Sequence, residues 1–324
     1  MMYPLKFTPI QKAKIWGGEK LSHFARHYSK DIKQVGETWD VSGIEGDESV
    51  VENGFLAGNS LNELVEVYMG DLVGEAVYDR FGNQFPLLVK LIDAQQNLSI
   101  QVHPNDELAQ KVHNFPSGKT EMWCVLDAAP DAFLIAGFNR PVTKQEYVSL
   151  VASNTLESVL QKHPVKKGDI FFIPAGCVHA IGAGCVILEI QQTSDLTYRI
   201  YDYNRLENGK PRELHTDLAI EAIDFEHWEN QKIQIHSSKN DVLKVVECDY
   251  FVANEIILDK SQEYDLAPIN SFVLLSVIEG HLRCQYDDDY VTITDGETIL
   301  IPAEMDSLLL VPTGEVRILE TYIK

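Results

Sequence analysis

The stretch GDIFFIPAGCVH, residues 168–179, joins a short apolar strand to a turn and ends on an imidazole. A Gly-Asp turn leads into the apolar residues 170–173, and Pro174-Ala-Gly176 is a second turn signal. The second turn is expected to direct His179 back toward the sheet. A lone histidine after such a turn is more often structural than functional, so other side chains have to support a site.

A second stretch, LSIQVHPND at residues 98–106, alternates apolar and polar residues. Successive side chains of a strand point to opposite faces, so Ser99, Gln101 and His103 share one face. That face is either the wet side of a half-buried strand or the floor of a site. Glu121, in GKTEMWCVL, is a candidate carboxylate on the next strand. Two imidazoles and a carboxylate suit Zn²⁺ and can leave positions open for water or substrate.

Strand-like runs dominate the rest of the chain, and helices are expected at residues 105–115, 143–163 and 212–225. One spacing occurs twice in the chain, in KGDIFFIPAG and in DGETILIPAE. The number of residues between Gly168 and Pro174 equals the number between Gly296 and Pro302. This similarity predicts one β-fold used twice, with Ser307 at the place of His179. The second copy therefore reads as structural. The expected domains are residues 1–235 and residues 236–324.

The composition restricts the class of protein and its partners. The 324 residues include 27 basic and 49 acidic residues, which gives a net charge of −22. Nucleic acid and anionic membranes are disfavoured as partners, and an anionic ligand requires a local concentration of Lys and Arg. The five cysteines form no CxxC pair, the chain has no long apolar run, and its first residues do not resemble a signal peptide. A cytoplasmic location is the default expectation.

The pattern G-x5-P-x-G-x2-H at Gly168, Pro174, Gly176 and His179 resembles the second motif of the cupin superfamily, whose members are jelly-roll barrels with this His as a metal ligand. The usual downstream Asn is replaced by Ala183. Several further stretches together resemble the type I phosphomannose isomerase family: KIWGG, GETWDVSG, LSIQVHPND, GKTEMWCVL, IPAGCVHAIG and LEIQQTSDLTYRIYDYNR. Only 57 residues separate Glu121 from His179, so the chain is similar to the short bacterial form.

This resemblance implies a mainly β fold of two cupin halves with a few helices, the second half being degenerate. It implies one zinc ion per chain and interconversion of mannose 6-phosphate and fructose 6-phosphate through a cis-enediol. The implied zinc ligands are Gln101, His103, Glu121 and His179. Residues implied in or near the site are Ser99, Lys90, Lys119, Glu189 and Arg199.

Chemical reasoning assigns provisional roles to these residues. Zinc is expected to act as a Lewis acid. Arg199 is expected to stabilise charge near the reacting carbons, because a guanidinium is not a base at neutral pH. Ser99, Lys90, Lys119 and Arg199 are the expected contacts for the phosphate or the nearby sugar oxygens. The proton carrier is expected to be Glu189 or Lys119, and a zinc-bound water is the third alternative.

Other interpretations stay open at this point. Lys119 and Arg199 could each be a solvated surface charge. Lys90 could reach from a strand end to solvent, and Glu189 could form a buried ion pair with Arg199. Arg205 fits the surface and the site equally well, and the residues expected to be packing rather than contacting substrate are Trp16, Trp39 and Trp123. Alternative functions are another cupin enzyme, such as a glucose-6-phosphate isomerase or a dioxygenase, and a non-catalytic sugar-phosphate-binding homologue. The oligomer is expected to be a monomer or a homodimer.

Overall fold

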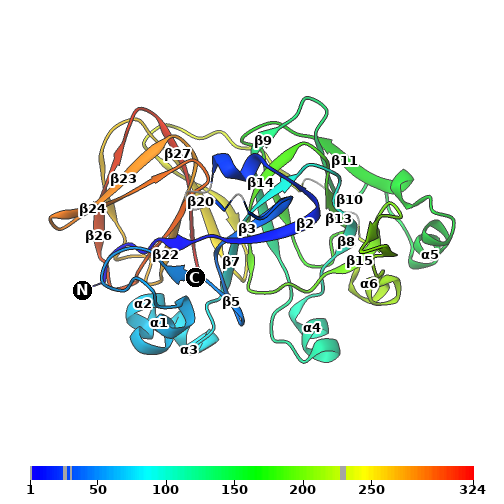
Figure 1. Ribbon diagram of the computed structural model, residues 1–324, viewed down its shortest axis with the longest axis horizontal. Coiled ribbons are helices and arrows are strands. Elements are labelled where there is room, and N and C mark those ends of the chain that lie inside the picture. The colour runs from blue at the N-terminus through cyan, green and yellow to red at the C-terminus, as the bar shows by residue number, and fades with distance from the viewer. Residues whose placement is uncertain (1, 25–27, 30, 227–230) are drawn as a thin grey trace.

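A computed structural model describes residues 2–24, 28–29, 31–226 and 231–324. Two β-rich halves lie side by side along the long axis of the molecule (Figure 1). One half contains the strands from β7 to β15, and the other contains those from β19 to β27. The expectation of a mainly β protein with two cupin-type halves and few helices is therefore confirmed.

Two sheets face each other in the first half. The larger sheet has the strand order β18 (Lys232–Ile233), β12 (Ile170–Ile173), β9 (Glu121–Ala128), β14 (Cys185–Gln192), β7 (Leu87–Ala94), β2 (Ile10–Gly18) and β3 (Val35–Val41). The smaller sheet has the order β11 (Leu160–Pro164), β10 (Phe133–Phe138), β13 (His179–Ile181), β8 (Ile100–Val102) and β15 (Tyr198–Tyr201). Apolar side chains from both sheets, such as Trp123 and Leu134, form one buried cluster between them. Burial of this shared face is what holds the two sheets together.

The second half repeats this arrangement on a smaller scale. One sheet has the order β19 (Val242–Glu247), β20 (Val252–Leu258), β27 (Val316–Tyr322), β22 (Val273–Glu279) and β25 (Thr298–Ile301). The other has the order β21 (Gln262–Asp265), β26 (Ser307–Pro312), β23 (His281–Tyr286) and β24 (Asp289–Thr294). Its apolar core is a separate cluster.

The repeated turn predicted from the sequence is present in both halves. Gly168 and Gly296 have φ angles of +88° and +78°, which L side chains rarely adopt, and each turn leads into a four-residue strand. His179 begins β13 and is buried, whereas Ser307 begins β26 and is exposed. The two halves share a backbone pattern, and the first half alone has an imidazole at this position.

The N-terminal segment contacts the C-terminal half. Leu5 forms an antiparallel bridge to Leu300, and the amide of Ala303 donates to the carbonyl of Leu72. The short strand pairs are β1 (Phe7–Thr8) with β6 (Val50–Val51), β4 (Gly43–Ile44) with β5 (Asp47–Glu48), and β16 (Leu206–Glu207) with β17 (Lys210–Pro211). The first residues of the chain thus pair with the second half, across the boundary expected at residues 235–236. That boundary stays a prediction.

The predicted helices are confirmed in part. The helix predicted over residues 105–115 is present as α4 (Asp106–His113), and Asn105 caps it by accepting from the amide of Leu108. The helix predicted over residues 143–163 is wrong in length, because α5 (Lys144–Ala152) ends just before Asn154, which adopts a φ of +55°. A short 3₁₀ helix (Leu156–Val159) and then β11 follow. The helix predicted over 212–225 is also shorter, at α6 (Thr216–Ala222).

Three helices were not predicted from the sequence: α1 (Leu61–Tyr68), α2 (Gly70–Val73) and α3 (Glu75–Phe81). Ser60 and Glu63 form a capping box at the start of α1, which is the local signal that could have revealed this helix. These helices lie beside the C-terminal half (Figure 1). No described helix is long and apolar enough to cross a membrane.

Candidate active site

Three residues of the smaller sheet lie in one row across neighbouring strands. Gln101 on β8 is the backbone partner of His179 on β13 and also of Arg199 on β15. The Oγ of Ser99 lies 3.3 Å from Oε1 of Gln101, as expected for residues that share one face of a strand. The strand LSIQVH therefore lies at the centre of the candidate site.

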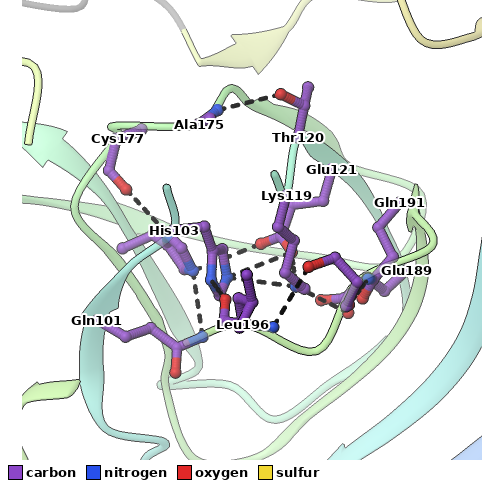
Figure 2. Close-up of polar contacts among 12 residues, drawn as sticks. Gln101, His103, Lys119, Thr120, Glu121, Ala175, Cys177, Glu189, Gln191 and Leu196 are labelled. Atoms are coloured by element: carbon purple, nitrogen blue, oxygen red, sulfur yellow. Dashed lines mark hydrogen bonds and ion pairs between the residues drawn. The ribbon is translucent and has the colours of Figure 1, made fainter. Parts of the chain in front are cut away.

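A cluster of possible metal ligands forms where β8, β9 and β13 meet. One ligating atom each from His103, Glu121 and His179 lies within 4.8 Å of the others, and all three residues are buried. The fourth expected ligand, Gln101, is adjacent, with its amide nitrogen 3.2 Å from Nε2 of His179. Figure 2 shows the side chains of Gln101 and His103, from β8 and the residue after it, converging with that of Glu121 from β9.

The protonation state of the two imidazoles fits a metal ion. Nδ1 of His103 lies 2.8 Å from the carbonyl oxygen of Leu196, and Nδ1 of His179 lies 2.9 Å from that of Cys177. Each Nδ1 therefore donates a hydrogen bond and leaves Nε2 with a lone pair toward the cluster. Burial lowers the pKa of His179 to about 4, and burial followed by the charge of Lys119 lowers the pKa of His103 well below its usual value.

Glu121 supplies the carboxylate of the cluster. Its Oε1 is buried and has no hydrogen-bond partner among the described residues, while it lies 3.4 Å from Nε2 of His179. Burial, followed by the charge of Glu189, raises the pKa of Glu121 above its usual value. An unpartnered buried oxygen beside two neutral imidazoles is costly unless a cation binds there. The residues present thus fit a zinc ion with His and carboxylate ligands.

Lys119 links this cluster to a second carboxylate. Its ammonium group bonds to Glu121, and it lies 3.4 Å from Oε1 of Glu189 and 3.2 Å from Nε2 of His103 (Figure 2). Burial disfavours this ammonium, but Glu121 and Glu189 raise the pKa of Lys119 above its usual value. The side chain is only 4% exposed, so the alternative of a solvated charge is wrong for Lys119.

Glu189 is held by cations and an indole. Trp123 Nε1 donates to its Oε2 over 2.9 Å, and Nζ of Lys90 lies 3.6 Å from its Oε1. Burial opposes ionisation, yet Lys119 and Lys90 lower the pKa of Glu189. The cations beside Glu189 are these two lysines rather than Arg199, whose Nη1 donates to the carbonyl of Glu213 over 2.8 Å.

Lys90 does not reach from its strand end to solvent. It is 4% exposed, and its ammonium lies 4.9 Å from the centre of the Trp39 ring. Trp39 in turn donates to Glu37 over 2.8 Å. Burial opposes ionisation of Glu37, but the charges of Lys90 and Lys14 lower its pKa to about 2.

A cavity of about 230 Å³ opens beside the cluster. Its lining includes the polar residues predicted from the sequence, namely Ser99, Lys90, Gln101, Lys119, Glu189 and Arg199. Five lining cations (Lys14, Lys90, Lys119, Arg199, Arg212) outnumber three carboxylates (Glu37, Glu189, Asp195). A chain with a net charge of −22 thus concentrates positive charge at this cavity, as an anionic ligand requires.

Several lining residues were not identified from the sequence. These are Lys14, Glu37, Asp195, Thr197 and Arg212. Lys14 and Glu37 lie within the quoted motifs KIWGG and GETWDVSG, so a charged residue two positions before a motif tryptophan was the available signal. Arg205 does not line the cavity, because its guanidinium bonds to Asp202 and to the carbonyl of Asn97.

The three tryptophans that we expected to pack in the core are buried. Trp39 is 3% exposed, Trp16 is 4% exposed and Trp123 is 0% exposed. Trp16 and Trp123 also line the cavity. The indole of Trp123 therefore combines packing with a hydrogen bond to Glu189.

The two facing sheets and the buried His-Glu-His cluster define a cupin-type protein with a candidate metal site. Two family models match the chain: "Phosphomannose isomerase type I, catalytic domain" over residues 4–122, and "Mannose-6-phosphate isomerase, cupin domain" over residues 241–323. The mannose-6-phosphate isomerase ManA of Bacillus subtilis is 39% identical over 302 residues, which cover 92% of this chain and 93% of that protein.

Two further relatives agree. A mannose-6-phosphate isomerase of Streptococcus mutans is 33% identical over 318 residues, covering 95% of both proteins. A crystal structure of mannose 6-phosphate isomerase from Bacillus subtilis matches with a TM-score of 0.88 at 33% identity, covering 99% of this chain and 100% of that one. The chain belongs to the type I phosphomannose isomerase family of enzymes, and it matches bacterial members over nearly their whole length.

Proposed function

We propose that this protein is a zinc-dependent mannose-6-phosphate isomerase, which interconverts mannose 6-phosphate and fructose 6-phosphate. The observation that carries the proposal is the buried cluster of His103, Glu121 and His179 beside a cavity with an excess of cations. The named activity of relatives aligned over more than 90% of both chains agrees with it.

Gln101, His103, Glu121 and His179 would hold one Zn²⁺. Bound there, zinc would supply Lewis-acid polarisation of the sugar oxygens at C1 and C2. The backbone carbonyls of Leu196 and Cys177 orient the two imidazoles by accepting from Nδ1. Trp123 and the surrounding apolar cluster exclude water from this end of the cavity.

The isomerisation removes a proton from C2 of the open-chain aldose and returns one to C1, and a hydroxyl proton moves from O2 to O1. We assign the carbon-bound proton to the pair Lys119 and Glu189, whose Nζ and Oε1 are 3.4 Å apart in the cavity wall. The Arg199 guanidinium keeps its proton at neutral pH and so cannot act as the base, and we assign it to stabilising the negative charge that develops on the enediolate oxygens.

Ser99, Lys90, Lys119 and Arg199 line the same cavity and are our proposed contacts to the substrate's sugar oxygens and phosphate. Charge-assisted hydrogen bonds to a phosphate also fix the register of the sugar relative to the acid–base pair.

The test is a coupled assay with mannose 6-phosphate on protein as purified, after chelation, and after zinc is restored. We expect turnover that chelation abolishes and stoichiometric zinc restores. Glucose 6-phosphate as an alternative substrate discriminates another cupin isomerase, and binding without turnover in the zinc-loaded protein would indicate a non-catalytic homologue. Incorporation of solvent deuterium into product would support proton transfer, and complete retention of the substrate hydrogen would contradict it.

A further inference from the structure

The cavity has two groups of cations with different surroundings. In one group, Nζ of Lys14 lies 3.2 Å from Glu37, and Nζ of Lys90 lies 3.6 Å from Glu189 and 3.9 Å from Asp195. The third ammonium group, that of Lys119, is paired with Glu121 and Glu189. Four carboxylates thus offset three ammonium groups there. A phosphate, with a charge of about −1.5 to −2, gains little from cations that are already paired.

The second group is Arg199 and Arg212, which are less completely paired. Arg199 donates to a neutral carbonyl, that of Glu213. Arg212 lies 3.4 Å from Asp202, but this carboxylate also bonds to Arg205, and the second partner of Arg212 is the half-exposed Glu207 at 3.8 Å. Burial, followed by the charge of Arg212, lowers the pKa of Arg199, so the two guanidinium groups are close enough to repel each other.

The segment after β17 presents Arg212 to the cavity and fixes Arg199 in place. The amide of His215 donates to the carbonyl of Arg199 over 2.7 Å, and the amide of Arg199 donates to Nδ1 of His215 over 3.2 Å. This segment therefore extends the row His179, Gln101, Arg199 by one further step. Arg212 stands three residues before His215 on this segment, and its guanidinium pairs with Asp202 and Glu207, neither of which is a candidate metal ligand.

We propose that Arg212 is the principal ligand of the substrate's phosphate. This inference rests on the proposed isomerase function. The phosphate is carried on C6, whereas the bonds that change are at C1 and C2, so the phosphate belongs at the opposite end of the cavity from the metal ligands. A guanidinium offers a planar fork that matches two phosphate oxygens, and incompletely paired charge makes it available for them. Arg199 then lies between the phosphate and the reacting carbons.

The experiment compares Arg212→Met with wild type in steady-state kinetics and in competitive inhibition by inorganic phosphate. Loss of one charge-assisted contact is expected to raise KM for mannose 6-phosphate, and the inhibition constant of phosphate, by about 10- to 100-fold. We expect kcat to stay within about threefold, because uniform binding energy is lost. Arg212→Lys, which keeps the charge but loses the fork, should give an intermediate value for both constants.

The matched control is Lys210→Met in β17, two residues before Arg212, which changes an exposed cation that does not line the cavity. We expect it to leave both constants unchanged. Unchanged constants in Arg212→Met would overturn the proposal, and so would a fall in kcat with KM unchanged, which would show that Arg212 positions Arg199. Zinc content and thermal unfolding identify a misfolded variant, and Arg212→Lys then carries the test.

Failure of the proposed function has a different outcome. If wild type does not isomerise mannose 6-phosphate, calorimetric titration with inorganic phosphate still compares wild type and Arg212→Met. Equal phosphate affinity in the two proteins would overturn the assignment of Arg212 whatever the reaction is.

Discussion

Gln101 and His179 face each other directly across β8 and β13, with the Gln101 amide nitrogen 3.2 Å from Nε2 of His179. The two residues are 78 positions apart in the chain. Their pairing joins the strand LSIQVH to the turn IPAG, the two motifs on which the candidate site depends. Backbone registry, rather than a side-chain contact alone, therefore holds the ligand set together.

His179→Ala is expected to lower bound zinc to well below one ion per chain, because it removes a neutral imidazole whose Nε2 faces Glu121. Elemental analysis of protein purified without added metal measures this. His236→Ala, which changes an exposed histidine of the loop before β19, is the matched control and should keep its zinc. Stoichiometric zinc in His179→Ala would contradict the assignment of His179 as a ligand.

Arg199→Ala is expected to keep zinc and fold while turnover falls by about 10²- to 10³-fold, the usual cost of losing one group that stabilises transition-state charge. Its hydrogen bond to the Glu213 carbonyl lies at the rim of the site, so the sheet should tolerate the change. Arg283→Ala, on the exposed face of the second half, controls for loss of a cation. Normal turnover in Arg199→Ala would remove this residue from the mechanism.

Asp40 predicts a pH dependence of stability. Burial, and to a smaller extent the charge of Glu297, raises its pKa from 3.8 to about 8. Between pH 3.8 and about 8 the folded protein keeps a proton on Asp40 that the unfolded chain releases. The contribution of Asp40 to the free energy of unfolding is therefore complete below pH 4 and is lost as pH rises through 8. Asp40→Asn should remove that component and be the more stable protein at pH 8.5.

Urea unfolding of wild type and Asp40→Asn at pH 5.5 and 8.5 measures the effect. The exposed change Asp288→Asn is the control and should follow wild type at both pH values. Parallel changes of all three unfolding midpoints would show that Asp40 does not titrate in this range.

Arg317 joins the two halves. Its Nη2 donates to the carbonyl of Gly168 over 3.0 Å, and its guanidinium pairs with Glu255, which is 1% exposed. Arg317→Met would leave a buried carboxylate with Ser237 as its remaining partner. We expect unfolding to become easier by about 2 kcal/mol, below the usual cost of breaking a buried pair because Arg317 is itself partly exposed.

Denaturant unfolding of Arg317→Met measures this loss. Lys324→Met breaks an exposed pair with Glu247 and should change the unfolding free energy much less. Equal effects of the two substitutions would show that the Arg317 contacts do not stabilise the interface between the halves.

Sequence patterns of short range were reliable guides to this fold. Alternation placed Ser99, Gln101 and His103 on one face, and the repeated Gly-to-Pro spacing revealed the second β half. Helix lengths were less predictable, because Asn154 ends α5 through a left-handed backbone conformation that the apolar periodicity of residues 143–163 does not encode. The helix α1 was missed because its capping residues lie among ordinary polar residues, and α2 and α3 have no side-chain cap to signal where they begin.

The sequence by itself determined the β class, the family and the residue types of the candidate site, because these depend on spacing and residue identity along single strands. Only the tertiary structure decided which charges meet. It paired Glu189 with Lys119 and Lys90, bound Arg205 to Asp202 outside the cavity, and brought Arg212 to the cavity lining. The physical reason is that an electrostatic interaction depends on distance and burial, and both are set by sheet registry between segments far apart in the chain.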